Sequence, residues 1–179
     1  MTTNIWVLGA HQSDFARNLT REGVGLDGLM ADVVHGTLED AGIPPDHIGT
    51  VHVANAFGEL FTGQAHLGAM PATVCPELWG VPAARHEAAC AAGSVAARAA
   101  VADLSAGFYD VALVVGVELE RNVGGQQASD HLGAAAFVGH EGEPGTVIWA
   151  DMFDQVAEEY DRRYGLDDAH LRAIGALNL

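Results

Sequence analysis

The sequence predicts an α/β fold, in which helices cover a sheet, and three observations lead to this prediction. The apolar run Ile48–Ala54 is typical of a buried strand, and apolar residues recur at helical spacing between Leu26 and Ala41. A second continuous apolar run, Tyr109–Glu118, has the composition of a central parallel strand. Strands that alternate with helices along the chain indicate βαβ units and therefore an α/β sheet.

The N-terminal part is expected to form a strand, a helix and a second strand. Asn4–Ala10 is a short apolar run, which favours a buried strand. Asp27 stands where it would cap the helix that follows, and Gly42 with the prolines behind it would end that helix.

A long stretch without a clear pattern, Asn55–Gly80, follows the second strand and is rich in Gly and Pro. Within it, Phe61–Ala69 is predicted to form a short helix. Loops of this length inside a compact domain usually serve a function. Cys75 lies in this stretch beside a proline, and we expect it to be a packed, inert thiol.

The most informative stretch surrounds Cys90, where an extended run gives way to alanine-rich sequence. A helix is predicted from Cys90 to Ser105, because Ala is the best helix former, and Gly107 suits its C-terminal end. In the first turn of a helix, unpaired N–H groups and the dipole stabilise a thiolate, which makes the sulfur a nucleophile. The flanking Ala and Gly residues leave a narrow substrate room to reach it. The alternative is a buried, unreactive cysteine, which is the commoner state of a free thiol.

Composition excludes several classes of function. The chain has 179 residues, enough for one domain or for part of a larger one, and its formal net charge is −16, which argues against nucleic acid and anionic membrane surfaces as partners. No run is long enough for a membrane span and no signal peptide is recognised, so a cytoplasmic protein is expected. Two cysteines do not suggest a disulfide framework. Lysine is absent, which excludes Schiff-base and P-loop lysines in this chain.

Two apparent motifs are rejected on their context. Gly23–Gly28 matches the spacing of a dinucleotide-binding loop, but polar residues precede it instead of a strand. His86–Cys90 is similar to the zinc motif H-E-x-x-H with Cys as its last residue, but this stretch is expected to end a strand, where positions four apart do not converge. No metal and no permanently bound cofactor are therefore expected.

The C-terminal part has a different character. Arg121–Gly145 is polar and Gly-rich, whereas apolar residues between Trp149 and Tyr160 mark one face of an amphipathic helix. A second helix is predicted to begin near Asp167. We therefore divide the chain into residues 1–120, an α/β domain with the nucleophile, and residues 121–179.

Three of these segments together resemble the thiolase superfamily, in particular the sterol-carrier-type thiolases often named acetyl-CoA acetyltransferases. The first is Cys90-Ala91-Ala92-Gly93 after an extended run, and the second is Gly116-Val117-Glu118 after a strand. The third is Met152–Gly165. The resemblance implies the N-terminal α/β half of a thiolase, a mixed sheet with helices. It also implies that residues 121–179 begin the helical loop insertion, which covers the active site and holds the pantetheine of coenzyme A.

The resemblance also implies a function. Cys90 would be the catalytic nucleophile of an acyl-CoA acyltransferase that works through an acyl-cysteine, with coenzyme A and acyl-CoA as substrates. A homodimer would form around Arg85–Ala88 and Asn55–Gly80. In thiolases a second half adds a Gly-His-Pro histidine and a second cysteine. That half is absent from this chain, so we expect the sequence to be part of a longer or split protein.

The sequence departs from the family pattern at three positions. Glu120 stands where many members carry Met, and Asp151 stands where close relatives carry His. His140 stands in Gly139-His140-Glu141-Gly142, which lacks the proline of Gly-His-Pro.

Two further functions stay open. One is a thiolase-like retro-aldolase of steroid side-chain breakdown, which would work with a small OB-fold partner protein. The other is a non-catalytic subunit that binds acyl-CoA and merely retains Cys90.

Overall fold

The computed structural model of the protein describes residues 4–142 and 146–178. The chain divides between Gly124 and Gly125 into two compact units, which we describe separately. The first unit contains the α-helices α1 (Leu26–Ala41), α2 (Gly58–Thr62), α3 (Met70–Val74) and α4 (Ala92–Ala106), the strands β1 (Thr50–Ala54), β2 (Ala83–His86) and β3 (Ala112–Gly116), and the 3₁₀ turns η1 (Pro45–His47), η2 (Leu67–Ala69), η3 (Pro76–Leu78) and η4 (Ala89–Ala91).

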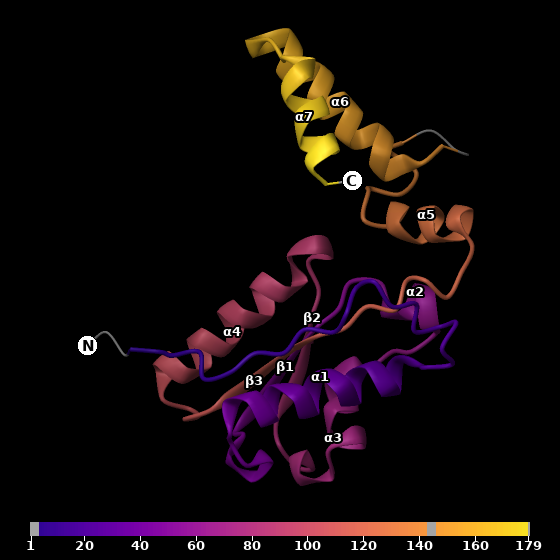
Figure 1. Ribbon diagram of the computed structural model, residues 1–179. Coiled ribbons are helices and arrows are strands. Elements are labelled where there is room, and N and C mark those ends of the chain that lie inside the picture. The colour runs from indigo at the N-terminus through magenta and orange to yellow at the C-terminus, as the bar shows by residue number, and fades with distance from the viewer. Residues whose placement is uncertain (1–3, 143–145, 179) are drawn as a thin grey trace. The chain divides into compact units, whose positions relative to one another are not determined.

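The three strands form one sheet in the order β2-β1-β3 (Figure 1). Both pairs are parallel, so the expected mixed sheet is, over the residues described, a purely parallel one. The register aligns the last residues of all three strands, because Ala54 of β1 lies opposite His86 of β2 and Gly116 of β3. The α/β class predicted from the sequence is thereby confirmed.

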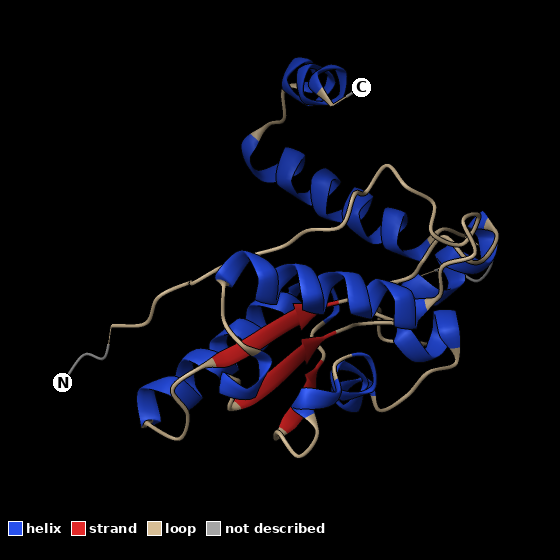
Figure 2. Ribbon diagram, turned by 60° about the horizontal axis from the view of Figure 1, so that its bottom comes forward, coloured by secondary structure: helices blue, strands red, loops and turns tan. Residues whose placement is uncertain are grey.

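Helices cover the two faces of this sheet, with α4 on one face and α1 and α3 on the other (Figures 1 and 2). Side chains alternate between the faces along a strand. Val51 and Val53 of β1 pack with α1 in the larger core, whereas Ala54 packs with Ala92 and Ala96 of α4.

The long helices end where glycine permits a left-handed residue. Gly42 after α1 has φ 63° and Gly107 after α4 has φ 73°, and the N–H group of each donates back to the last turn, as predicted. The beginning of α1 differs from the prediction. Gly25 is its N-cap residue and Asp27 lies in its first turn, where a carboxylate still interacts favourably with the helix dipole.

Two predicted elements of the first unit are wrong. Asn4–Ala10 is extended but pairs with no described strand, and Trp6 and Val7 are 75% and 89% exposed. An apolar run becomes a strand only where a neighbouring strand accepts its main-chain hydrogen bonds, and the N–H of Ala10 instead donates to the carboxylate of Asp40. The single helix Phe61–Ala69 is also interrupted, because Gly63 (φ 70°) ends α2 and His66 (φ 57°) turns the chain before η2.

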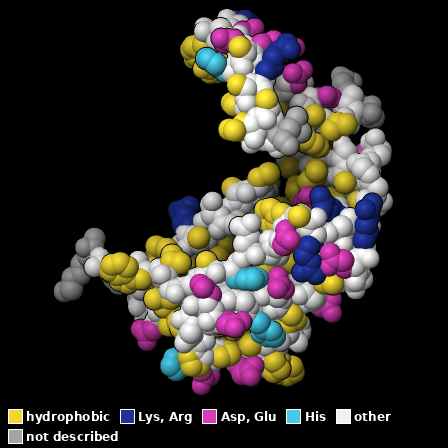
Figure 3. All heavy atoms as spheres, viewed as in Figure 1, with side chains coloured by type: hydrophobic (Ala, Val, Ile, Leu, Met, Phe, Trp, Pro, Cys, Tyr) yellow, Lys and Arg dark blue, Asp and Glu magenta, His cyan; other side chains and the backbone are white. Residues whose placement is uncertain are grey.

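The second unit consists of α5 (Gly125–Gly133), α6 (Ile148–Tyr164) and α7 (Asp168–Leu177). The predicted amphipathic helix and its successor are confirmed, and the Asp167 side chain caps α7 by accepting from the Ala169 N–H. Helix α5 was not predicted, because its nine residues are mostly polar and it begins and ends with glycine. The helices expose several large apolar side chains, and apolar patches are visible in Figure 3 (Trp149, Phe153, Val156, Tyr160, Leu171, Ile174). Over the described part of the chain, every helix is too short or too polar to span a membrane.

Candidate active site

The three strands end at one edge of the sheet, and the segment that follows each strand carries polar or reactive side chains. Asn55–Phe57 follows β1, Glu87–Cys90 follows β2, and Val117–Glu118 follows β3. The carboxyl edge of a parallel sheet is the usual place of a binding site in α/β proteins. The carboxyl edge of this sheet is therefore the candidate active site.

Cys90 lies at this edge with an exposed thiol. It occupies the 3₁₀ turn η4, in which the N–H of Ala91 donates to the Ala88 carbonyl at 2.9 Å. Helix α4 begins two residues after Cys90. The sequence predicts a helix that begins at about Cys90, with the thiol in its first turn. The tighter turn sets the thiol just ahead of the first α-helical residue, Ala92.

The turn that presents Cys90 holds a strained residue. Ala89 has φ 46°, a left-handed conformation that costs an L-residue with a Cβ about 1–2 kcal/mol. The Glu87 carboxylate accepts the Ala89 N–H at 2.6 Å and so helps to hold this conformation. Strained backbone of this kind persists where the surrounding structure enforces it, often at functional sites.

Small residues follow Cys90 in the sequence, and a Cβ built on Gly93, in the first turn of α4, would meet nothing within 4 Å. The small residues around Cys90 therefore leave it accessible, as the sequence predicted.

The loop after β1 is fixed from both neighbouring strands. Asn55 is 1% exposed, and its amide donates to the Val117 carbonyl at 2.6 Å and accepts from the Gly58 N–H at 2.8 Å. Both halves of the amide are thus used, one across to the β3 side and one within the loop. This residue was missed in the sequence, where it carried no signal beyond following a strand.

Arg85 of β2 holds the same loop from the other side. Its guanidinium donates to the carbonyl oxygens of Asn55 at 3.3 Å and Ala56 at 3.2 Å, and it forms an ion pair with Glu59. The hydrogen bond from Arg85 lowers the pKa of the Glu59 carboxyl.

Glu118, the last residue of the Gly-Val-Glu motif, contacts this loop through its carboxylate. It accepts from the N–H groups of Ala56 and Phe57, the latter at 3.4 Å. Desolvation by the surrounding protein raises the pKa of Glu118, although the residue keeps an exposed surface, and the two hydrogen bonds oppose that rise. The motif noted in the sequence therefore tethers the loop between β1 and α2.

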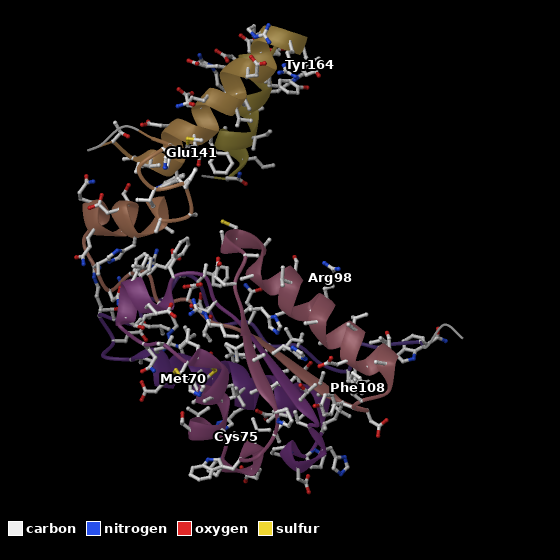
Figure 4. All side chains as sticks on the ribbon, turned by 180° about the vertical axis from the view of Figure 1, so that it is seen from behind. Met70, Cys75, Arg98, Phe108, Glu141 and Tyr164 are labelled. Atoms are coloured by element: carbon white, nitrogen blue, oxygen red, sulfur yellow. The ribbon has the colours of Figure 1, made fainter. Side chains whose placement is uncertain are left out.

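Cys75 behaves differently from Cys90. It is 2% exposed and packs in the larger core, on the side of the sheet away from α4 (Figure 4). Burial raises the pKa of its thiol, which donates to the Glu77 carboxylate at 3.4 Å. The prediction of a packed thiol is confirmed.

The other singled-out residues lie elsewhere. His86 ends β2, and its ring contacts His52. His140 and Asp151 belong to the second unit, where the His140 ring stacks on Phe137 with centroids 4.1 Å apart.

Comparison with known proteins assigns this architecture to a family. Residues 5–166 match the model of the thiolase N-terminal domain. The chain is 31% identical over 163 residues to an acetyl-CoA acetyltransferase of Methanocaldococcus jannaschii, covering 91% of this chain and 40% of the relative. It is 25% identical over 175 residues to an acetyl-CoA acetyltransferase of Methanothermobacter thermautotrophicus, covering 98% of this chain and 44% of the relative. The chain thus spans less than half the length of these two relatives.

Proposed function

We propose that Cys90 is the nucleophile of an acyl-CoA acyltransferase. The premise is that this chain belongs to the thiolase superfamily and carries its N-terminal part. The observation that carries the proposal is the exposed thiol of Cys90 on a strained turn at the carboxyl edge of the parallel sheet. Cys75 is buried and bonded to Glu77, which leaves Cys90 as the accessible thiol.

The proposed reaction is the thiolysis of a 3-ketoacyl-CoA. The Cys90 thiolate attacks the keto carbon, the bond between that carbon and the α-carbon breaks, and the departing acetyl-CoA carbanion takes up a proton. The thiol of a free coenzyme A then attacks the acyl-cysteine, loses its proton and leaves as acyl-CoA, which regenerates the Cys90 thiolate. The reverse sequence is a Claisen condensation.

In this proposal, Glu87, Arg85 and Glu118 position the nucleophile and the loop beside it, and they transfer no proton. Glu87 holds the Ala89 N–H and with it the turn that presents the thiol. Arg85 and Glu118 fix the loop that borders the site on the β1 side. In the proposal, the histidine that accepts the thiol proton and the acid that protonates the carbanion come from the second half that the family resemblance implies.

Coenzyme A enters this proposal as a substrate and not as a resident cofactor. We further propose a cytoplasmic homodimer with its contact around Arg85–Ala88 and Asn55–Gly80. β2 is an edge strand of the described sheet, with Ala83 and Ala84 exposed, and exposed edge strands tend to be paired or covered. Sedimentation of the full-length protein as a monomer at micromolar concentration would contradict the dimer.

The function is tested with the full-length protein and the variants Cys90→Ala and Cys75→Ala. We expect acetoacetyl-CoA to leave an acetyl adduct on wild type and on Cys75→Ala, and none on Cys90→Ala, as read by intact mass spectrometry. Thiolysis should fall by roughly 10⁴-fold or more in Cys90→Ala, because removal of a covalent nucleophile disables the whole catalytic set.

Three outcomes would contradict the proposal. An acetyl adduct that maps to Cys75 would reverse the assignment of the nucleophile. Carbon–carbon cleavage of a 3-hydroxyacyl-CoA without any acyl adduct would favour the retro-aldolase, whereas acyl-CoA binding without turnover would favour the non-catalytic subunit.

A further inference from the structure

Three titratable side chains from three different elements meet beneath the helix that follows Cys90. His52 of β1 is 4% exposed, and its Nδ1 lies 2.9 Å from Nε2 of His86 on β2. On its other side, Nε2 of His52 lies 3.4 Å from a carboxylate oxygen of Asp103 on α4. The acyl-transfer mechanism described above uses none of these three residues.

Only one arrangement of hydrogens satisfies all the contacts of neutral rings. A carboxylate only accepts, so His52 carries its hydrogen on Nε2 and donates it to Asp103. Nδ1 of His52 is then an acceptor, and His86 must donate to it from its own Nε2. The three side chains therefore form one directed chain, from His86 through His52 to Asp103.

Thr50 agrees with this direction. Its hydroxyl oxygen lies 3.5 Å from Nε2 of His52 and 3.3 Å from the Pro82 carbonyl, which can only accept. The hydroxyl hydrogen therefore points to Pro82, and its oxygen faces the N–H of His52 as a second acceptor.

In this arrangement the hydrogen between the two rings belongs to His86, so a second hydrogen on His52 at Nδ1 requires His86 to give up its own from Nε2. Burial first, and then the neighbouring His86, lower the pKa of His52, whereas the Asp103 carboxylate raises it in part.

Other charged groups near the chain point elsewhere. Arg98 of α4 projects away from the sheet (Figure 4), and Arg85, next to His86 on β2, pairs with Glu59. From β3 the residue opposite His52 is Val114, which carries no charge. Among the described residues, the polar side chains in contact with His52 and His86 are those of Asp103 and Thr50, besides the two imidazoles themselves.

Helix α4 has little else to fix its position on the sheet. Its buried side chains are Ala92, Ala96 and Ala100, which present a smooth surface without the ridges that set the register of a helix. A buried polar network, in contrast, is directional and specifies one arrangement. The position of α4 along the strands decides where the turn with Cys90 stands.

We propose that His86, His52 and Asp103 are positioning residues, whose directed hydrogen-bonded chain locks the nucleophile helix α4 onto the sheet and thereby places Cys90 for acyl transfer. The inference rests on the proposed function for its catalytic consequence. The structural part of the inference, that two Nε2–H imidazoles fix the position of α4, does not depend on which reaction the protein catalyses.

The test compares full-length wild type with Asp103→Asn, Asp103→Glu and His47→Gln. His47 is an exposed histidine on η1 and serves as the matched control. For acetoacetyl-CoA thiolysis we expect Asp103→Asn to lower kcat about tenfold with little change in KM, because misplacement of reacting groups weakens the chemical step. Asp103→Glu should recover part of the loss, and His47→Gln should match wild type.

The pH profile separates positioning from a merely structural role. Without the Asp103 charge the pKa of His52 falls further, so the acid limb of kcat should move to lower pH in Asp103→Asn. A folded Asp103→Asn variant with unchanged kcat and an unmoved acid limb would overturn the proposal.

A second measurement needs no variant and no turnover. In ¹⁵N-histidine spectra of the wild-type protein near pH 7.5, His52 and His86 should both be Nε2–H tautomers, and an Nδ1–H tautomer at either position would overturn the chain. Alkylation of Cys90 by iodoacetamide should also change in Asp103→Asn and not in His47→Gln. If wild type lacks thiolysis but these two results hold, the proposed function fails and the positioning chain survives.

Discussion

The two faces of the sheet are built on opposite principles. Toward α1 the sheet presents Val51 and Val53, and the helix returns large side chains such as Met30 and Val34, both fully buried. Toward α4 it presents His52 and Ala54, and the helix returns alanines and Asp103. The first face buries much apolar surface, which is the main source of stability. The second face buries little apolar surface and is held by directed polar contacts. Its helix, α4, is the one that follows Cys90.

The largest effect on stability is expected from truncation on the α1 face. Met30→Ala should lower the free energy of unfolding by about 3 kcal/mol, because it removes a fully buried side chain and leaves a cavity. Urea unfolding of the full-length protein measures this, with Val101→Ala, on an exposed side chain of α4, as a control that should stay within about 0.5 kcal/mol. If Met30→Ala still folds, its Cys90 should be alkylated as fast as in wild type. A large loss of alkylation rate would contradict the claim that only the α4 face affects Cys90.

The α4 face should be sensitive to added volume instead. Ala96 is fully buried against Ala54, so Ala96→Leu should destabilise by about 2 kcal/mol and push α4 from the sheet. Unlike Met30→Ala, it should also lower kcat, because the helix carries the turn of Cys90. Ala97→Leu, on an exposed residue of the same helix, is the matched control. An unchanged kcat in a destabilised Ala96→Leu variant would show that the position of α4 does not affect the activity of Cys90.

The α4 face should also make stability depend on pH. The pKa of His52 is lowered in the folded state from 6.5, so the unfolded chain binds a proton more readily. The contribution of His52 is therefore complete above pH 6.5 and is lost as pH falls from there toward the lower folded pKa. In urea unfolding between pH 7.5 and pH 5, His52→Gln should show a weaker pH dependence than wild type, and His47→Gln should follow wild type.

Glu118 acts in the opposite sense, since its raised pKa penalises the charged carboxylate in the folded state. Its contribution favours folding at low pH and fades as pH rises from 4.5 through the folded pKa. The comparison of His52→Gln with wild type cancels this background. Equal pH dependence of the two proteins would refute the role assigned to His52.

The smallest effect is expected at the turn of Cys90. Ala89→Gly relieves the left-handed strain but adds backbone freedom to the unfolded chain, so stability should rise by only about 0.5 kcal/mol. Acetyl-enzyme formation should slow at the same time, because the turn is less tightly held. Rapid-quench mass spectrometry measures the second effect, and faster acylation with higher stability would argue against a functional role of the strain.

Local rules predicted the parts of the fold that depend on local sequence. The apolar stripe of α1, the left-handed glycines at positions 42 and 107, and the packing of Cys75 each follow from a few neighbouring residues. Local rules failed for Asn4–Ala10, because a strand also needs a partner, and for α5, because its few residues are mostly polar and it begins and ends with glycine.

The candidate site shows the same boundary. Cys90 and the motif that ends at Glu118 were recognised, since each has a signature within a few residues. The contact of His52 with His86 joins residues 34 apart, and it requires the register of two parallel strands and the choice of face. Strand register is not encoded in a short stretch of sequence, so the polar chain beneath α4 could only be found in the structure.

Arg85 determines how the segment between β1 and α2, which borders the site, is held in place. A guanidinium is a planar fork whose donors keep fixed angles to one another, and here they reach two carbonyl oxygens of successive residues and a carboxylate on α2. The segment between β1 and α2 is thereby cross-braced at three points by one rigid group. We expect this segment to loosen as a unit if the guanidinium is removed, and a lysine ammonium, which is a point charge without a plane of donors, cannot make the same three contacts.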